Sequence, residues 1–177
     1  MNEDKAAGLK DHLLAEIPSL RAFALSLAGA ADRADDLVQD TLVKAWANAE
    51  SFTHGTNLRA WLFTIMRNTF FSQYRKARRE VQDVDGEAAA RLVSPPNQIS
   101  HLDFADFKAE LDLLPADQRE ALVLIGASGF SYEEAAEICG VAVGTIKSRV
   151  NRARRRLIER LALHGEEIAK NPDAAKV

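Results

Sequence analysis

The segment GVAVGTIKSRVNRARRRL, residues 140–157, carries six Lys and Arg residues and no Asp or Glu. The whole chain of 177 residues has 23 Lys+Arg against 26 Asp+Glu, a formal net charge of −3. Cationic side chains contact the phosphates of nucleic acids, and arginine and asparagine also pair with base edges through two hydrogen bonds. The clustering therefore predicts a nucleic-acid-binding element within an otherwise acidic protein.

The residues around this segment have the spacing of a helix-turn-helix. Ser131 and Glu134 form a capping-box pattern at the start of a helix expected over residues 131–139. Gly140 suits a left-handed turn after it, and a second helix is expected over residues 144–163. At about 100° per residue, the core face of the second helix holds Ile146, Val150, Ala153 and Leu157.

The opposite face of that second helix combines side chains that read bases with side chains that bind phosphates. Ser148, Asn151, Arg152 and Arg155 occupy it, and Lys147, Arg149, Arg154 and Arg156 lie on the flanks. This layout is typical of a recognition helix. The alternative is a solvated basic helix end whose arginines complement the helix dipole.

A second candidate nucleic-acid surface lies on the helix expected over residues 58–79. One side is core, with Leu58, Trp61, Leu62, Ile65 and Thr69. The other interleaves aromatic rings and cations: Arg59, Phe63, Arg67, Phe70, Phe71, Tyr74 and Arg78. Rings that stack on bases beside cations that meet phosphates suit single-stranded nucleic acid. The alternative is that Phe63 and Phe70 pack against the first helix. Asn68 and the loop FTHGTN, residues 52–57, are expected to form a pocket for one unstacked base.

The helix expected over residues 32–50 is acidic and predicts a protein-binding face. Asp32 is its expected N-cap, and Asp32 and Asp35 are also explained by the helix dipole. Gln39 and Asp40 lie further in, where the dipole does not explain them. We expect these two residues to contact a protein and not DNA.

Helical periodicity runs through the chain and predicts an all-α protein of two small helical domains joined by a flexible linker. The expected parts are an N-terminal domain over residues 1–80, a linker over 81–100, a helix-turn-helix domain over 101–164 and a disordered tail over 165–177. Further helices are expected in residues 101–115 and over residues 116–126. The pattern over residues 9–29 is expected to break at Pro18, where a second helix begins, and to stop at Gly29.

Composition argues against several other classes of protein. No apolar run is long enough to cross a bilayer and no signal-peptide pattern is present, so we expect a cytoplasmic location and no membrane partner. The single cysteine, Cys139, is expected to be a small core residue. The four histidines, His12, His54, His101 and His164, are scattered. We therefore expect no metal site, no cofactor and no enzymatic activity.

Three stretches together resemble the extracytoplasmic-function (ECF) sigma factors of bacterial RNA polymerase. DDLVQDTLVKAW resembles the helix that binds the coiled coil of the largest polymerase subunit. NLRAWLFTIMRNTFFSQYRK resembles the helix that melts and reads the −10 promoter element. LPADQREALVLIGASGFSYEEAAEICGVAVGTIKSRVNRARRRL resembles the domain that reads the −35 element. The segments FTIMRNTFF and GASGFSYEEAAEI are most similar in sequence to the general-stress-response subgroup, which a small anti-sigma factor inhibits.

The resemblance implies three partners, which are core RNA polymerase, promoter DNA and an anti-sigma factor, and a monomer when free. Combined with the helical faces it assigns residues to three surfaces. Polymerase contact falls to Asp36, Gln39 and Asp40. Contact with the −10 element falls to Thr53, His54, Asn57, Phe63, Arg67, Asn68 and Tyr74. Contact with the −35 element falls to Thr145, Lys147, Ser148, Arg149, Asn151, Arg152 and Arg155.

Two other functions compete with a promoter-specificity subunit. One is a sigma-like adaptor that titrates an anti-sigma factor without binding DNA, which need not keep a basic recognition helix. The other is an ordinary helix-turn-helix regulator, which needs neither the acidic helix nor the aromatic one and usually dimerises on two half-sites. The combination of all three motifs favours the sigma factor.

Overall fold

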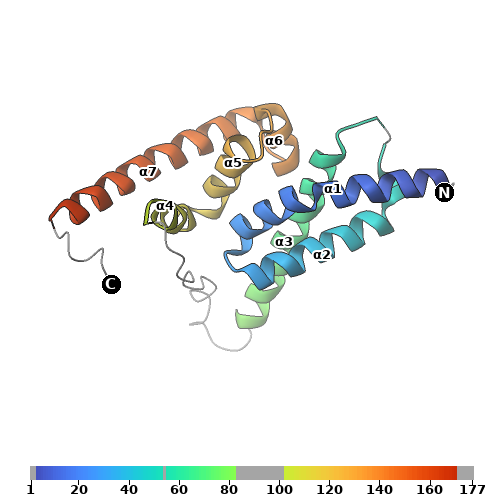
Figure 1. Ribbon diagram of the computed structural model, residues 1–177, viewed down its shortest axis with the longest axis horizontal. Coiled ribbons are helices and arrows are strands. Elements are labelled where there is room, and N and C mark those ends of the chain that lie inside the picture. The colour runs from blue at the N-terminus through green and yellow to red at the C-terminus, as the bar shows by residue number, and fades with distance from the viewer. Residues whose placement is uncertain (1–2, 54, 83–101, 171–177) are drawn as a thin grey trace. The chain divides into compact units, whose positions relative to one another are not determined.

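The computed structural model describes residues 3–53, 55–82 and 102–170, and the regular elements within these ranges are helices (Figure 1). The chain divides into two compact units. The N-terminal unit holds α1 (Glu3–Ala28), α2 (Ala31–Ala47), the short 3₁₀-helix η1 (Ala49–Ser51) and α3 (Leu58–Gln82). The C-terminal unit holds α4 (Leu102–Asp112), α5 (Ala116–Gly126), most of α6 (Tyr132–Cys139), and α7 (Val143–Lys170). The all-α prediction is confirmed, and no helix in the described ranges is long and apolar enough to cross a membrane.

The N-terminal unit is a three-helix bundle in which α1, α2 and α3 each pack against the other two. Phe23 of α1 and Phe63 of α3 are fully buried, and their rings stack with centroids 4.8 Å apart. Leu20, Leu62 and Met66 are fully buried as well. Burying such side chains contributes about 1.5–3 kcal/mol each, so this contact supports the surfaces built on α2 and α3.

The first helix is continuous through Pro18, and the predicted break there is wrong. A proline inside a helix costs about 3 kcal/mol, because it removes one backbone hydrogen bond and crowds the preceding turn. Burial on both sides of Pro18 offsets this cost, with Leu13 before it and Leu20 and Phe23 after it. The predicted stop is confirmed, since Gly29 has φ +74° directly after the helix.

The helix expected over residues 32–50 is α2, which begins one residue earlier than expected, and Asp32 is not its N-cap. Ala30 occupies the cap position and makes no side-chain cap hydrogen bond. Asp32 instead lies in the first turn, where a negative charge is favourable beside the unpaired backbone N–H groups. An aspartate thus serves the helix start by its charge and not by a cap bond.

The core of the C-terminal unit lies along α7, which packs against α5 and α4. Ile146, Val150, Ala153 and Leu157 are all buried, which confirms the predicted core face. Leu114, from the turn between α4 and α5, belongs to the same cluster as Ala153 and Leu157. The bounds of α5 agree with the helix predicted over residues 116–126.

The helix-turn-helix consists of α6 and α7 and has the predicted cap. The Ser131 N–H donates to Glu134 Oε2 at 2.8 Å, and the Glu134 N–H donates to Ser131 Oγ at 3.1 Å. Gly140 has φ +64°, which matches the predicted left-handed turn. Cys139 is buried, as expected.

The last helix continues to Lys170, so the tail predicted from residue 165 is partly helical. Extending an existing helix needs no new nucleation, and Glu, Ala and Lys in residues 166–170 favour it. The predicted linker, residues 81–100, lies outside the described residues except for the end of α3. The final residues, 171–177, lie outside them as well.

Candidate nucleic-acid and protein interfaces

The exposed face of α7 presents Asn151 and Arg152, both on the side opposite the buried core residues. Ser148, one turn earlier, is half-buried. Arg152 Nη2 donates to Ser148 Oγ at 2.7 Å, and Arg152 Nε donates to the Ser148 carbonyl oxygen at 3.3 Å. The Ser148 hydroxyl in turn donates to the Thr145 carbonyl oxygen at 3.2 Å. Ser148 and Arg152, both predicted to contact the −35 element, are therefore hydrogen-bonded to each other.

Two of the six cations in residues 140–157 are used to hold α7 to α5. Arg149 Nε lies 3.1 Å from Asp117 Oδ2, and the Arg149 side chain is only 19% exposed. Arg156 Nη1 donates to Gln118 Oε1 at 3.2 Å. The guanidinium of Arg149 is turned toward the neighbouring helix and paired with a carboxylate, so the predicted contact of Arg149 with DNA competes with this ion pair.

The other cations of the segment are exposed. Lys147 Nζ lies 5.8 Å from the centre of the Tyr132 ring, and Arg155 Nε lies 3.8 Å from Glu159 Oε1. Exposed pairs of this kind contribute about 0.2–1 kcal/mol, so a phosphate competes with them readily. Thr145 is half-buried in the first turn of α7, and its N–H donates to the Ala142 carbonyl oxygen at 2.9 Å.

The structure separates the α3 residues that the sequence grouped on one DNA-binding surface. Phe63 is fully buried against Phe23, so the prediction that it stacks on DNA is wrong. Arg67 is half-buried, with its guanidinium 4.8 Å from the centre of the Phe71 ring. Asn68 and Tyr74 are exposed, but at about 100° per residue they lie on opposite flanks of α3.

Asn68 lines a pocket of about 310 Å³ between α2 and α3. Its other lining residues are Lys44, Asn48, Ser51, Trp61, Ile65, Thr69 and Ser72. Lys44 Nζ donates to Thr69 Oγ1 at 3.0 Å across the two helices. The pocket therefore offers an aromatic ring, an ammonium group and several polar side chains next to Asn68.

The loop before α3 has a structural role at its end. Asn57 Oδ1 accepts a hydrogen bond from the Ala60 N–H at 3.1 Å, so Asn57 caps the start of α3. Thr53 is exposed, and its carbonyl oxygen accepts from the Thr56 hydroxyl at 2.7 Å. Neither Thr53 nor Asn57 lines the pocket beside Asn68. The predicted contact of His54 falls outside the described residues.

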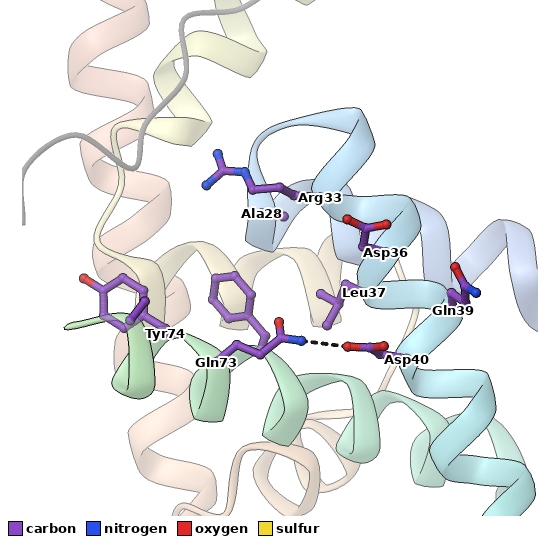
Figure 2. A pocket seen from close by; sticks show the side chains of 10 residues that line it. Ala28, Arg33, Asp36, Leu37, Gln39, Asp40, Gln73 and Tyr74 are labelled. Atoms are coloured by element: carbon purple, nitrogen blue, oxygen red, sulfur yellow. Dashed lines mark hydrogen bonds between the residues drawn. The ribbon is translucent and has the colours of Figure 1, made fainter. Parts of the chain in front are cut away.

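Tyr74 lines a different groove, of about 530 Å³, on the other flank of α3 (Figure 2). The same groove is lined by all three residues predicted to bind polymerase, Asp36, Gln39 and Asp40. Gln73 Nε2 donates to Asp40 Oδ2 at 2.7 Å, which ties α3 to α2 at this point. The structure therefore places Tyr74 with the expected protein-binding residues and away from Asn68.

The outer face of α2 contains two exposed apolar residues that sequence reasoning did not assign. Val43 is 61% exposed and Trp46 is 46% exposed. They follow Asp36, Gln39 and Asp40 at helical spacing, so the five residues form one stripe, which we call the α2 stripe. The sequence did contain a signal for this surface, because Trp46 lies on the polar side of an amphipathic helix.

An ion pair on the surface joins α1 to the start of α2. Arg21 Nε lies 2.6 Å from Asp35 Oδ1, and Nη2 lies 3.2 Å from Oδ2. The hydrogen bond from Arg21 lowers the pKa of the Asp35 carboxyl below its ordinary value. The carboxylate of Asp35 therefore already has an ion-pair partner in its own unit, whereas Asp36 beside it is exposed in the α2 stripe.

Comparison with known proteins identifies both units. Residues 14–80 match the Sigma-70 region 2 family, and residues 105–157 match the Sigma-70 region 4 family. The chain is 65% identical to the ECF RNA polymerase sigma factor EcfG of Rhodopseudomonas palustris, over 90% of this chain and 88% of that protein.

Two solved structures are similar along most of the chain. The sigma factor RpoE of Bartonella quintana, solved in complex with the anti-sigma factor NepR, has a TM-score of 0.78 and 61% identity and covers 88% of this chain and 97% of its own. CnrH, solved with the cytosolic domain of CnrY, has a TM-score of 0.64 and 29% identity over 92% of this chain and 90% of its own. With region 2 and region 4 present in order, and with a relative of this identity along nearly its whole length, the chain belongs to the ECF family of RNA polymerase sigma factors.

Proposed function

We propose that this sigma factor directs polymerase to promoters through three surfaces: the α2 stripe for core polymerase, the Asn68 pocket for the −10 element and the exposed face of α7 for the −35 element. The observation that carries the proposal is the separation of charge between two exposed helix faces. The α2 stripe holds exposed carboxylates beside apolar side chains, and α7 holds exposed cations and an asparagine beside its core. The first suits a basic protein partner and the second suits DNA.

The α2 stripe has the chemistry of a protein-binding surface. Trp46 and Val43 offer apolar area that a partner can bury, and buried aromatic residues often dominate such contacts. Asp40 has one carboxylate oxygen engaged by Gln73, which limits the movement of the side chain and leaves the other oxygen for a cation. We assign polymerase binding to this stripe.

The Asn68 pocket has the size and chemistry to take one unstacked base. Trp61 supplies an aromatic surface, and the Asn68 amide offers two donors and an acceptor. Lys44 supplies a positive charge that can bind a phosphate of the DNA strand. Unstacking a base costs a few kcal/mol, which contacts of this kind offset. We assign −10 recognition to this pocket, and we leave Phe63 out because it is buried.

Transcription from a defined promoter tests the proposal as a whole. Purified core polymerase with the full-length chain should produce run-off transcripts from a promoter that core polymerase alone does not use. Asp40→Lys should abolish these transcripts by preventing core binding through like-charge repulsion. Arg155→Ala in the other unit should leave co-elution with core polymerase unchanged. Normal co-elution of Asp40→Lys with core polymerase would remove the α2 stripe from the proposal.

We also propose that an anti-sigma factor holds the free chain inactive, as part of a general stress response. Support comes from RpoE of Bartonella quintana, which was solved with the anti-sigma factor NepR and is 61% identical to this chain. An inhibitor that binds both units at once gains from effective concentration, by a factor of about 10²–10⁴. Pieces covering residues 1–82 and 102–177, checked for helicity by circular dichroism, should each bind far more weakly than the full chain. Equal affinity for one piece and for the full chain would exclude a clamp across both units.

A further inference from the structure

The Ser148 hydroxyl is engaged on both sides by groups of its own helix. Its single hydrogen is donated to the Thr145 carbonyl oxygen, at 3.2 Å. One of its two lone pairs accepts from Arg152 Nη2, at 2.7 Å. One lone pair is left over. To donate to a base edge, Ser148 would have to give up its bond to Thr145, and Ser148 is also half-buried.

The guanidinium of Arg152, by contrast, keeps one edge free. A guanidinium has five N–H groups, one on Nε and two on each Nη. The bonds to Ser148 use the Nε–H and one Nη2–H, which lie on the same side of the group. Two N–H groups on Nη1 and one on Nη2 remain, so the outer Nη1/Nη2 edge still holds a pair of parallel donors. A guanine is bound in the major groove by such a pair, through its O6 and N7 atoms.

The two bonds to Ser148 also fix the direction of that free edge. Arg152 is exposed, and an exposed arginine otherwise samples many rotamers whose loss on binding lowers affinity. With Nε and Nη2 both held one turn earlier on the helix, the plane of the guanidinium is set by α7 itself. The side chain is therefore oriented before DNA arrives.

We propose that Ser148 is a positioning residue for −35 recognition: it holds the Arg152 guanidinium so that the outer Nη1/Nη2 edge faces a base, and it does not read a base of its own. The inference rests on the proposed base-reading role of α7. It changes the role of Ser148 from an independent base contact to a residue that acts through Arg152. Asn151, exposed on the same face, keeps its own base contact.

The test measures base preference with the intact complex. The parent chain on core polymerase first selects a promoter from a pool of randomised fragments, and each base pair of the selected −35 element is then substituted in turn. Affinities are measured for the parent, for the single variants Ser148→Ala, Ser148→Thr, Arg152→Ala and Asn151→Ala, and for Arg152→Ala combined with Ser148→Ala or with Asn151→Ala. Thermal unfolding of each chain checks that the fold is unchanged.

Ser148→Ala should lower affinity about 3- to 10-fold, because Arg152 is then ordered only on binding. The base preference of Ser148→Ala should relax at the same base pair as that of Arg152→Ala. Adding Ser148→Ala to Arg152→Ala should lower the affinity no further. Ser148→Thr should restore the parent preference, since a helical threonine keeps a hydroxyl that can bond the preceding turn. Asn151→Ala, the matched control, should act at a different base pair and add to Arg152→Ala.

Two results would overturn the positioning role while leaving α7 as the reader. One is a Ser148→Ala effect that falls at another base pair or adds to that of Arg152→Ala, which would make Ser148 an independent base contact. The other is an unchanged preference in Ser148→Ala when Arg152→Ala does alter it. If Arg152→Ala itself leaves base preference unchanged, the proposed readout by Arg152 fails, and the inference fails with it.

Discussion

Arg149 and Arg154 are both arginines of α7, but they have different surroundings. Arg149 is paired with Asp117 on α5 and its side chain is 19% exposed, whereas Arg154 is exposed. A cation that joins two helices contributes to the stability of the fold, and an exposed one is available for phosphate. Residue type alone therefore does not decide which arginine binds DNA.

We predict that substitution separates these two roles. Arg149→Ala should lower the free energy of unfolding by about 1 kcal/mol, because a partly buried ion pair is lost. It should leave the salt dependence of DNA binding nearly unchanged. Arg154→Ala, its matched control, should leave stability within about 0.5 kcal/mol and lower the salt slope by roughly one. Urea unfolding and salt titrations of −35 duplex binding measure both, and the reverse assignment would restore Arg149 as a phosphate contact.

The Arg21–Asp35 pair makes the stability of the fold depend on pH, and the direction of this dependence follows from the lowered pKa of Asp35. The folded-state pKa of Asp35 is lowered by its hydrogen bond to Arg21, so the pair stabilises the fold above the ordinary carboxyl pKa of 3.8. This contribution is lost as the pH falls through the lowered pKa. In an NMR titration the Asp35 carboxyl should titrate below pH 3.8, and Arg21→Gln should return it to the ordinary range. An Asp35 pKa that is the same in both chains would contradict the pairing in solution.

At the scale of elements, the features predicted correctly are those set by neighbouring residues. The capping box of Ser131 and Glu134, the left-handed Gly140 and the bounds of α5 each depend on local backbone chemistry, and each prediction is confirmed. The break at Pro18 was wrong because burial along α1, which depends on α2 and α3, outweighs the local cost. Local rules miss a balance of this kind.

The surfaces of α3 show the same limit at a candidate site. The aromatic residues of this helix follow one repeating pattern in the sequence, yet Phe63 is in the core and Tyr74 is in a groove with α2 residues. Which flank of α3 meets α1 and which meets α2 depends on the packing of three helices. The sequence predicted a pocket formed by Asn68 and the loop over residues 52–57, but the lining comes from α3 itself together with Lys44, Asn48 and Ser51, which were not predicted.

The α2–α3 pocket makes a prediction about strand opening. Asn68→Ala should reduce promoter melting, with a cost on the order of 1–3 kcal/mol for the lost base contact. Co-elution with core polymerase should be unaffected, because Asn68 lies outside the α2 stripe. Permanganate reactivity of unpaired thymines measures melting. Equal melting by Asn68→Ala and the parent would exclude Asn68 as a base reader.

The net charge of the whole chain, −3, limits how free protein meets DNA. Long-range attraction to a polyanion is not expected from such a charge, so binding must depend on the few cations exposed on α7. Of the six in residues 140–157, Arg149 and Arg156 are engaged with α5 and Arg152 is assigned to a base. Lys147, Arg154 and Arg155 remain for phosphates.

We therefore predict a shallow salt dependence for the full-length chain on a −35 duplex. Three phosphate contacts correspond to a slope of log Kobs against log salt of about −2.7, because each releases about 0.9 counterion. If Arg149 and Arg156 also bound phosphates, the slope would be near −4.5. Titration from low to moderate salt, with a duplex of unrelated sequence as the control for non-specific binding, distinguishes the two values. A slope near −4.5 would mean that the contacts between α7 and α5 open when the chain binds DNA.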